Sequence, residues 1–317
     1  MLTCRAVTTP PDRPDPFAVG LDLGGTDLKS ARVFADGRIE AFGRRPSRAA
    51  ESADGPLEAI AEAVGELTAG RRARLVGVGL GSPGAIHPET GALVGETPHF
   101  PHWAGFPLRE RLAARLGVPL AVDNDANLAA LGEHRLGAAR GTRVSITVTL
   151  GTGIGGGIVV DGRVFRGARG GAGEIGHLPL GRGGVPCRCG VADCVEPEAS
   201  GSGLGAHARA WGMTPAEART VFAAAAAGEP RAVAVVATMV DRLGATIGAA
   251  VSLLDPEVVV VGGGVAQAGE ALMVPLREAV ARYTMGSHRD GLRVVAAALG
   301  ERAGVTGAGL LAWDASR

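Results

Sequence analysis

The chain has 317 residues, of which 46% are hydrophobic, and its 32 basic and 32 acidic residues give a formal net charge of zero. At this length a single hydrophobic core usually stops growing, so the length favours two lobes over one. Neutral charge without blocks of like charge argues against nucleic acid or a membrane surface as a partner and favours a small-molecule ligand. The sequence contains no run of eighteen uninterrupted apolar residues and no apolar signal core, so we expect a cytoplasmic protein.

The first predicted elements form a β-hairpin behind a Pro-rich stretch over residues 1–16, which we expect to be a disordered tail. Apolar residues 17–23 lead into Gly24-Gly25-Thr26, and a second strand ends at an Asp-Gly turn. Backbone N–H groups of such a glycine turn can approach an anion, and the Thr26 hydroxyl adds a donor. Asp22 ends the first strand, where a carboxylate could hold Mg2+ through water or simply cap the turn.

The same pattern of strand, glycine loop, strand and Asp-Gly turn recurs about 125 residues later in the sequence. Apolar residues 144–150 lead into Gly151-Thr152-Gly153, and Asp161-Gly162-Arg163-Val164 repeats the turn Asp36-Gly37-Arg38-Ile39. A repeat at this distance predicts two similar lobes that face each other. Either glycine loop alone is often only a turn, but the pair indicates a phosphate-binding site. Neither is a P-loop, because no Gly-Lys-Ser/Thr follows, and neither has the short βαβ context of a dinucleotide fold.

The remaining pattern alternates helices with short buried strands. We expect helices over residues 56–69, 108–116, 215–227, 231–254 and 303–312, and strands over 75–80, 119–122 and 258–261. These elements predict a small N-terminal lobe over residues 17–122 and a larger lobe over 123–299, with a helix within 300–317 packing back on the first. Gly263 and Gly264 follow the last strand, where they suit either the adenosine side of a nucleotide or a plain tight turn.

Two acids and two amides crowd the segment Asp123-Asn124-Asp125-Ala126-Asn127, after a strand and before a helix. Helix N-capping accounts for one of the four polar residues and leaves the others unexplained. When a phosphoryl group is transferred to an alcohol, a carboxylate accepts the hydroxyl proton and an amide can orient the acceptor. Asp125 is therefore the candidate base, and Asn124 is the candidate positioning residue.

A cluster of metal-ligating residues lies in a glycine-rich segment of the second half. His177, Cys187, Cys189 and Cys194 fall within eighteen residues, a ligand set typical of a tetrahedral zinc site. Three buried thiols are the alternative, and a disulfide is disfavoured because three is odd. With four protein ligands the zinc has no open position, so its role would be structural. Glu174, His177 and Glu196 supply acceptors suited to a polyhydroxylated substrate.

Taken together, these motifs resemble the ROK family of sugar kinases and repressors over nearly the whole chain. The resemblance rests on Asp22-Leu-Gly-Gly-Thr26, Asn124-Asp125, Leu150-Gly-Thr-Gly-Ile-Gly-Gly-Gly157, Glu174-x-x-His177 and Cys187-x-Cys189-Gly190-x-x-x-Cys194-x-Glu196. It implies the actin-like ATPase fold, of ribonuclease H-like type, with two α/β lobes around a cleft. It also implies Asp125 as catalytic base, Asn124, Glu174, His177 and Glu196 as sugar ligands, and His177, Cys187, Cys189 and Cys194 as zinc ligands.

The sequence departs from the family pattern at a few positions. Asp193 stands where relatives usually have Gly before the last cysteine, and Pro197 stands where a small residue is common. His99 stands where family glucokinases usually carry Asn, in a segment that lies near the sugar in relatives. This last difference bears on sugar specificity.

The resemblance leads us to expect an ATP:hexose 6-kinase, a glucokinase, that uses ATP, Mg2+ and structural Zn2+ and forms a homodimer or a homotetramer. Polyphosphate is the alternative phosphoryl donor. An N-acetylmannosamine or N-acetylglucosamine kinase is the second interpretation, because the same layout serves N-acylated sugars. A sugar-responsive repressor would need a DNA-binding module, and about seventeen residues before the first strand are too few for one. A sugar-binding protein without turnover would have to lack the base, and Asp125 is present.

Overall fold

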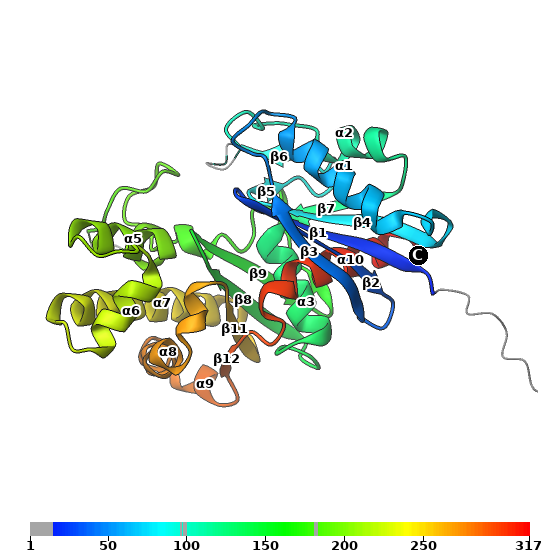
Figure 1. The fold of residues 1–317 in the computed structure, drawn as a ribbon. Coiled ribbons are helices and arrows are strands. Elements are labelled where there is room, and N and C mark those ends of the chain that lie inside the picture. Colours follow the sequence, from blue (N-terminus) through cyan, green and yellow to red (C-terminus); the bar gives the residue numbers. More distant parts are fainter. Residues whose placement is uncertain (1–14, 96, 98–99, 181–182) are drawn as a thin grey trace, which may run out of the picture.

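Two five-stranded sheets with the same strand order form the centre of the molecule (Figure 1). The computed structural model describes residues 15–95, 97, 100–180 and 183–317. The first sheet has the order β3-β2-β1-β4-β7 and contains β1 (Phe17–Leu23), β2 (Asp27–Phe34), β3 (Ile39–Pro46), β4 (Leu75–Ser82) and β7 (Leu120–Asn124). The second has the order β10-β9-β8-β11-β12 and contains β8 (Val144–Leu150), β9 (Ile154–Val160), β10 (Arg163–Val164), β11 (Val258–Gly262) and β12 (Arg293–Ala296).

In each sheet an antiparallel meander of three strands is extended by two parallel strands. The internal repeat predicted from the sequence is therefore confirmed by the strand order of both sheets. The smaller pair β5 (Ala85–Ile86) and β6 (Leu93–Val94) forms a separate two-stranded ribbon.

Helices cover both sheets in layers. On the first sheet, α1 (Gly55–Thr68) and α2 (Leu108–Leu116) share one apolar core with the strands, and α10 (Ala303–Ala315) packs against β1, β2, β4 and β7. On the second sheet, α3 (Asp125–Leu136) contacts β8 and β9, while α7 (Pro230–Leu254) and α8 (Glu270–Tyr283) belong to the core that contains the strand residues Ile146 and Val259. Because α3 and α10 pack on each other, they form the layer between the two sheets (Figure 1).

Glycines allow this central layer to pack at backbone distance. A Cβ added at Gly79 of β4 would lie 1.8 Å from the carbonyl oxygen of Ala308 in α10, and one added at Gly307 would lie 1.8 Å from the carbonyl oxygen of Leu128 in α3. Any side chain at these positions would force the elements apart. The abundance of Gly and Ala in α10 follows from this position, because protein surrounds the helix on most sides.

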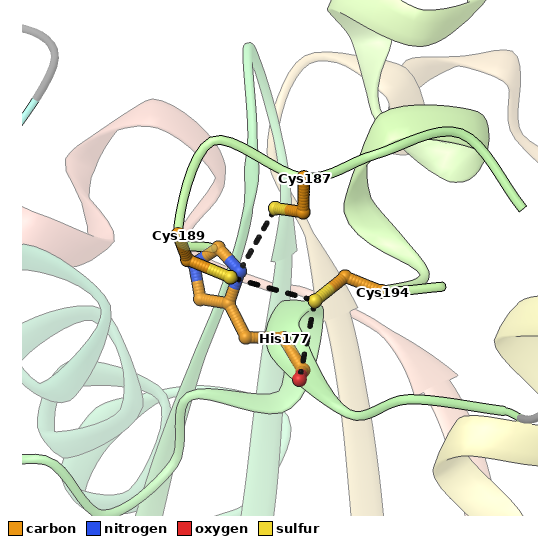
Figure 2. Close-up of side chains that lie close together, drawn as sticks. All are labelled: His177, Cys187, Cys189 and Cys194. Atoms are coloured by element: carbon orange, nitrogen blue, oxygen red, sulfur yellow. Dashed lines mark hydrogen bonds between the residues drawn. The ribbon is translucent and has the colours of Figure 1, made fainter. Parts of the chain in front are cut away.

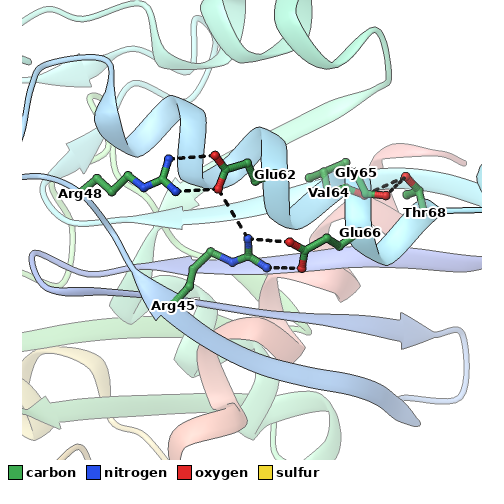
Figure 3. Close-up of polar contacts among 7 residues, drawn as sticks. All are labelled: Arg45, Arg48, Glu62, Val64, Gly65, Glu66 and Thr68. Carbon is green, nitrogen blue, oxygen red and sulfur yellow. Dashed lines mark hydrogen bonds and ion pairs between the residues drawn. The ribbon is translucent and has the colours of Figure 1, made fainter.

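Arg45 at the end of β3 and Arg48 just beyond it bind two glutamates of α1 (Figure 3). Arg48 makes two hydrogen bonds to Glu62, at 2.9 and 2.8 Å, and Arg45 pairs in the same two-pronged way with Glu66. Hydrogen bonding to Arg45 holds the pKa of Glu66 below its usual value. Exposed ion pairs contribute little individually, so these contacts orient the helix more than they stabilise the fold.

The helix α7 is long and apolar enough, by length and composition, to cross a membrane. Half of its most apolar stretch is buried, and its residues Leu243, Ile247 and Val251 lie in the core of the second sheet. The apolar character of α7 is thus explained by packing inside the protein.

The second half of the chain also contains the helices α4 (Glu196–Ala199), α5 (Gly201–Ala210), α6 (Ala218–Ala226) and α9 (Gly286–Arg289). The 3-10 helices are η1 (Arg72–Arg74), which precedes β4, and η2 (Ile175–His177), η3 (Val265–Ala268) and η4 (Gly300–Arg302). The helix expected over residues 215–227 begins later than predicted, at Ala218, because the backbone of Pro215 to Glu217 instead forms a turn in which the N–H of Glu217 donates to the carbonyl of Pro215. Residues 1–14 of the expected tail, and His99, lie outside the described residues.

Candidate active site

The carboxyl ends of three parallel strands bring the predicted acidic residues to one edge of the first sheet. Asp22 of β1 pairs in register with Gly81 of β4, and Gly81 pairs with Asp123 of β7. Ligand sites of open α/β sheets occur at such carboxyl edges. In the second sheet, Thr149 of β8 pairs with Gly262 of β11, so the loops after these two strands are also neighbours.

Asp22 lies in a partly buried position between a cation and a helix end. Its carboxylate accepts a hydrogen bond from the Nζ of Lys29, its cross-strand partner, at 3.1 Å. A Cβ added at Gly304, in the first turn of α10, would lie 2.7 Å from the Asp22 Cγ, so the absence of a side chain there admits the carboxylate. The ammonium group and the helix N-terminus both favour a negative charge at this point. Neither Lys29 nor Gly304 was singled out from the sequence, because only the fold brings them to Asp22.

The first glycine turn, Gly24-Gly25-Thr26, is held from one side by Ser47. The hydroxyl of Ser47 donates to the carbonyl of Gly25 at 3.0 Å, and its backbone N–H donates to the carbonyl of Thr26 at 2.8 Å. The N–H of Gly24 closes the turn on the carbonyl of Asp27. The turn is therefore fixed through its carbonyl groups.

The polar segment after β7 divides into residues with different partners. Asp123 is 2% exposed and forms an ion pair with Arg166 at 2.7 Å, and it also accepts a hydrogen bond from the amide of Asn127. Asn124 caps α3, since its Oδ1 accepts from the N–H groups of Ala126 and Asn127, while its Nδ2 donates to the carbonyl of Gly84. Asp123 and Asn127 are thus occupied in holding the segment together. The Asp123–Arg166 pair was not predicted, because nothing in the spacing of these residues links them.

Asp125 is the first residue of α3, and its carboxyl group is perturbed more than that of an ordinary surface acid. Burial, followed by the charge of Asp22 and to a lesser degree that of Glu174, raises the pKa of Asp125 to about 7, although a hydrogen bond from the Ala126 N–H opposes the shift. A carboxyl group that titrates near neutral pH is suited to general base catalysis. The structure therefore brings Asp125 near Asp22 and Glu174, as a shared site requires.

Glu196 contacts the second glycine loop. Its Oε2 accepts a hydrogen bond from the N–H of Ile154 at 2.8 Å, and a Cβ added at Gly153 would lie 2.5 Å from the same oxygen. On the other side of the loop, the N–H of Gly201 donates to the carbonyl of Gly151, and the hydroxyl of Ser202 donates to that of Thr152. One of the predicted sugar ligands therefore lies against one of the predicted phosphate loops.

Gly263 and Gly264 follow β11 beside the same loop. Gly263 has a φ of +89°, and a Cβ there would lie 2.4 Å from the carbonyl oxygen of Leu150. No atom lies within 4 Å of a Cβ added at Gly264. Gly263 is thus required by the backbone, while Gly264 has open space beside it.

The predicted zinc ligands converge (Figure 2). The Sγ of Cys187 lies 3.6 Å from the Nδ1 of His177, the Sγ atoms of Cys189 and Cys194 are 3.5 Å apart, and all four ligand atoms lie within 4.8 Å of one another. A tetrahedral zinc with Zn–S bonds of about 2.3 Å separates its ligand atoms by about 3.5–3.8 Å, so this donor set fits the ion. Burial and the other two thiols raise the pKa of Cys194 to about 12, a penalty that a bound cation would remove.

Glu174 interacts electrostatically with the candidate base and with the candidate zinc ligand His177. Burial raises its pKa, the charge of His177 lowers it and that of Glu196 raises it, although the side chain keeps access to solvent. His177 turns Nδ1 toward the thiols, which leaves Nε2 for another partner (Figure 2). The predicted sugar ligands around Asp125 thus interact electrostatically with one another.

Known proteins resemble this chain over most of its length. The model of the ROK family matches residues 18–315. A glucokinase of Halalkalibacterium halodurans is 36% identical over 318 residues, covering 94% of this chain and 95% of that protein. An N-acetylmannosamine kinase of Citrobacter koseri is 38% identical over 271 residues, covering 83% of this chain and 88% of that protein.

The fold can be compared with a solved structure of a ROK family glucokinase from Streptomyces griseus in complex with glucose and AMPPNP. The Streptomyces griseus structure has a TM-score of 0.81 and is 34% identical to this chain, and the match covers 94% of this chain and 99% of the Streptomyces griseus chain. The predicted actin-like ATPase fold is thereby confirmed. Since the family model spans nearly all of both sheets and all of the candidate site residues, the chain belongs to the ROK family.

Proposed function

We propose that the protein is an ATP-dependent hexose 6-kinase, and specifically a glucokinase. The proposal rests on Asp125, the first residue of α3, whose carboxyl group has a pKa of about 7. The charges that raise this pKa belong to Asp22, which is predicted to lie at the phosphates, and to Glu174, a predicted sugar ligand. The ROK glucokinases at 34–36% identity over most of the chain support the same activity, and one of them was solved with glucose and an ATP analogue.

In the proposed reaction, Asp125 accepts the proton of the sugar 6-hydroxyl as that oxygen attacks the γ-phosphorus of ATP. The new O–P bond forms as the bond to the β-phosphate oxygen breaks, and ADP leaves with the charge. The 6-phosphate of the sugar and ADP are the products. A positioned base of this kind contributes about 10²- to 10⁴-fold to the rate.

Phosphate binding falls to the two glycine loops. We assign Gly24, Gly25 and Thr26 to one side of the phosphates, Gly151, Thr152 and Gly153 to the other, and Gly263 and Gly264 to the adenosine. Asp22 would hold Mg2+ through water, and Mg2+ would neutralise charge on the phosphates. Its carboxylate fits this task, since it lies at the carboxyl edge of the sheet beside the first glycine turn.

Sugar recognition falls to four side chains. Glu174, Glu196 and the Nε2 of His177 would bind sugar hydroxyls, and the Nδ2 of Asn124 would orient the acceptor while its Oδ1 caps α3. Zinc held by His177 and the three cysteines would fix the orientation of the histidine ring. The metal would thus support sugar binding without taking part in phosphoryl transfer. The two sheets would belong to lobes over residues 17–122 and 123–299, in a cytoplasmic homodimer.

An N-acylated hexosamine is the second candidate substrate, favoured by the identity to the Citrobacter koseri N-acetylmannosamine kinase. A coupled assay decides between them. Glucose, mannose, fructose, N-acetylglucosamine and N-acetylmannosamine are each tested with ATP and with polyphosphate. The highest kcat/KM is expected for glucose with ATP; a preference for an N-acylated sugar would instead establish the second candidate, and turnover of no sugar would refute both.

A further inference from the structure

An arginine in the middle of α7 is buried between two carboxylates. Arg242 is 8% exposed, and its guanidinium donates to Asp193 Oδ1 at 3.2 Å and forms an ion pair with Glu198. Buried charges are costly unless they are paired, so the position of each partner depends on the others. None of these three residues has a role in the chemistry proposed above.

Asp193 links Arg242 to the zinc loop. It directly precedes Cys194, is 7% exposed, and has a φ of +63°, a left-handed conformation that glycine adopts more readily. A Cβ added at Gly184 would lie 2.5 Å from its Oδ1, so the loop closes around the carboxylate. The left-handed backbone conformation costs an aspartate more free energy than a glycine, and the ion pair with Arg242 offsets this cost.

Glu198 links Arg242 to the segment that carries Glu196. Both acids lie in α4, a helix of a single turn, so a shift of Glu198 moves Glu196 with it. The helix α7 also packs against α4 and against η2, which ends in His177. Arg242 therefore holds two short segments, one with a zinc ligand and one with a predicted sugar ligand, against a single long helix.

We propose that Arg242 is a positioning residue for sugar recognition, which it serves by fixing the zinc loop and α4 relative to each other through Asp193 and Glu198. The inference rests on the proposed sugar kinase activity. Without the guanidinium, Asp193 and Glu198 lose the contact that joins them, and Cys194 and Glu196 move apart. Displacements of about 1 Å in such residues can reduce activity by about 100-fold, and here the effect falls on the sugar and not on ATP.

The test compares Arg242→Met, which keeps the apolar stem, with Arg242→Lys, which keeps the charge but cannot reach both carboxylates in the same way. Arg231→Met, an exposed arginine at the start of the same helix, is the control. KM for glucose is expected to rise by about 10-fold or more in Arg242→Met and less in Arg242→Lys, with KM for ATP changed by less than about 2-fold. Zinc should also pass faster from Arg242→Met to a chelator.

A milder variant covers the case in which Arg242→Met does not fold. Asp193→Asn removes the charge and keeps a side chain that tolerates the left-handed conformation. Its effect on KM for glucose should be non-additive with that of Arg242→Lys, because both act through one contact. Additive effects, or an unchanged KM and unchanged zinc release in both variants, would overturn the inference. If the wild type phosphorylates no sugar, the activity proposal fails, and zinc release still decides the role of Arg242.

Discussion

The carboxylate of Glu196 occupies the space that the missing side chain of Gly153 leaves. An added Cβ at residue 153 would lie 2.5 Å from the Oε2 of Glu196, and that oxygen accepts the N–H of Ile154 at 2.8 Å. Gly153 does not have a positive φ, so glycine is needed here for space and not for backbone conformation. This contact joins a predicted phosphate loop to a predicted sugar ligand. A substitution at Gly153 therefore tests whether sugar binding depends on the loop.

Replacing Gly153 by alanine should weaken sugar binding. The methyl group displaces the Glu196 carboxylate and breaks a hydrogen bond to a charged acceptor, an interaction of about 1.5–3 kcal/mol. KM for glucose is expected to rise by about 10- to 100-fold in steady-state assays. Gly65→Ala is the control, because no atom lies within 4 Å of an added Cβ at that position in α1. An unchanged KM in Gly153→Ala would mean that Glu196 does not contribute to sugar binding from this position.

Replacing Asp125 by asparagine should abolish most turnover while preserving sugar binding. The amide has nearly the same shape but cannot accept the hydroxyl proton. kcat is expected to fall by about 10²- to 10⁴-fold, with little change in glucose affinity measured by calorimetry. Near-normal turnover in this variant would exclude Asp125 as the base.

The raised pKa of Asp125 predicts a specific dependence of activity on pH. The base must be ionised, so kcat/KM should be level above pH 7 and should fall about tenfold per pH unit below it. Rate profiles from pH 5 to 9 with glucose and ATP measure this directly. A profile that stays level down to pH 5 contradicts the assignment.

The same shift predicts that Asp125 lowers the stability of the fold at high pH. The pKa of about 7 in the folded state exceeds the unfolded value of about 3.9, so the folded protein holds the proton more tightly. This contribution is present below about pH 4 and is lost as the pH rises through 7. Asp125→Asn should therefore have a higher Tm than the wild type at pH 8 and a smaller difference at pH 4, as measured by differential scanning calorimetry.

Removing the metal should affect the sugar more than the nucleotide. Metal analysis of the purified protein is expected to find one zinc per chain, and chelation should raise KM for glucose with little change in KM for ATP. Cys189→Ser should reproduce the effect, whereas Cys4→Ser, in the Pro-rich N-terminal segment, should not. A protein without zinc that binds sugar normally would show that the cluster does not support recognition.

Glu133 of α3 should be needed for stability and not for chemistry. Its carboxylate is fully buried and accepts the backbone N–H groups of Ala138, Ala298 and Leu299, which ties α3 to the segment before α10. Glu133→Leu removes three hydrogen bonds from backbone donors to a charged acceptor, at a cost of about 3 kcal/mol or more in the free energy of unfolding. Urea denaturation measures the loss, with Glu278→Leu on the exposed face of α8 as the control.

Much of the architecture follows from local patterns in the sequence. The two glycine hairpins, their Asp-Gly turns and the alternation of buried strands with helices predicted two repeated units, and the strand orders agree. Hydrophobic periodicity and glycine turns act over a few residues, so they can be read without the fold. The start of α6 was misplaced because a proline can equally begin a helix or a turn.

The sequence by itself determined the cluster of candidate zinc ligands, because these residues lie close along the chain, and it singled out Asp125 by the crowding of polar residues. Only the tertiary structure decided which of those polar residues are occupied elsewhere, that Lys29 and the start of α10 surround Asp22, and that Arg242 joins Asp193 to Glu198. The physical reason is the separation of the partners along the chain, which ranges from 7 positions for Asp22 and Lys29 to 282 positions for Asp22 and Gly304. Such pairs form only when sheets and helices bring distant segments together, and burial then sets the pKa of the groups that meet.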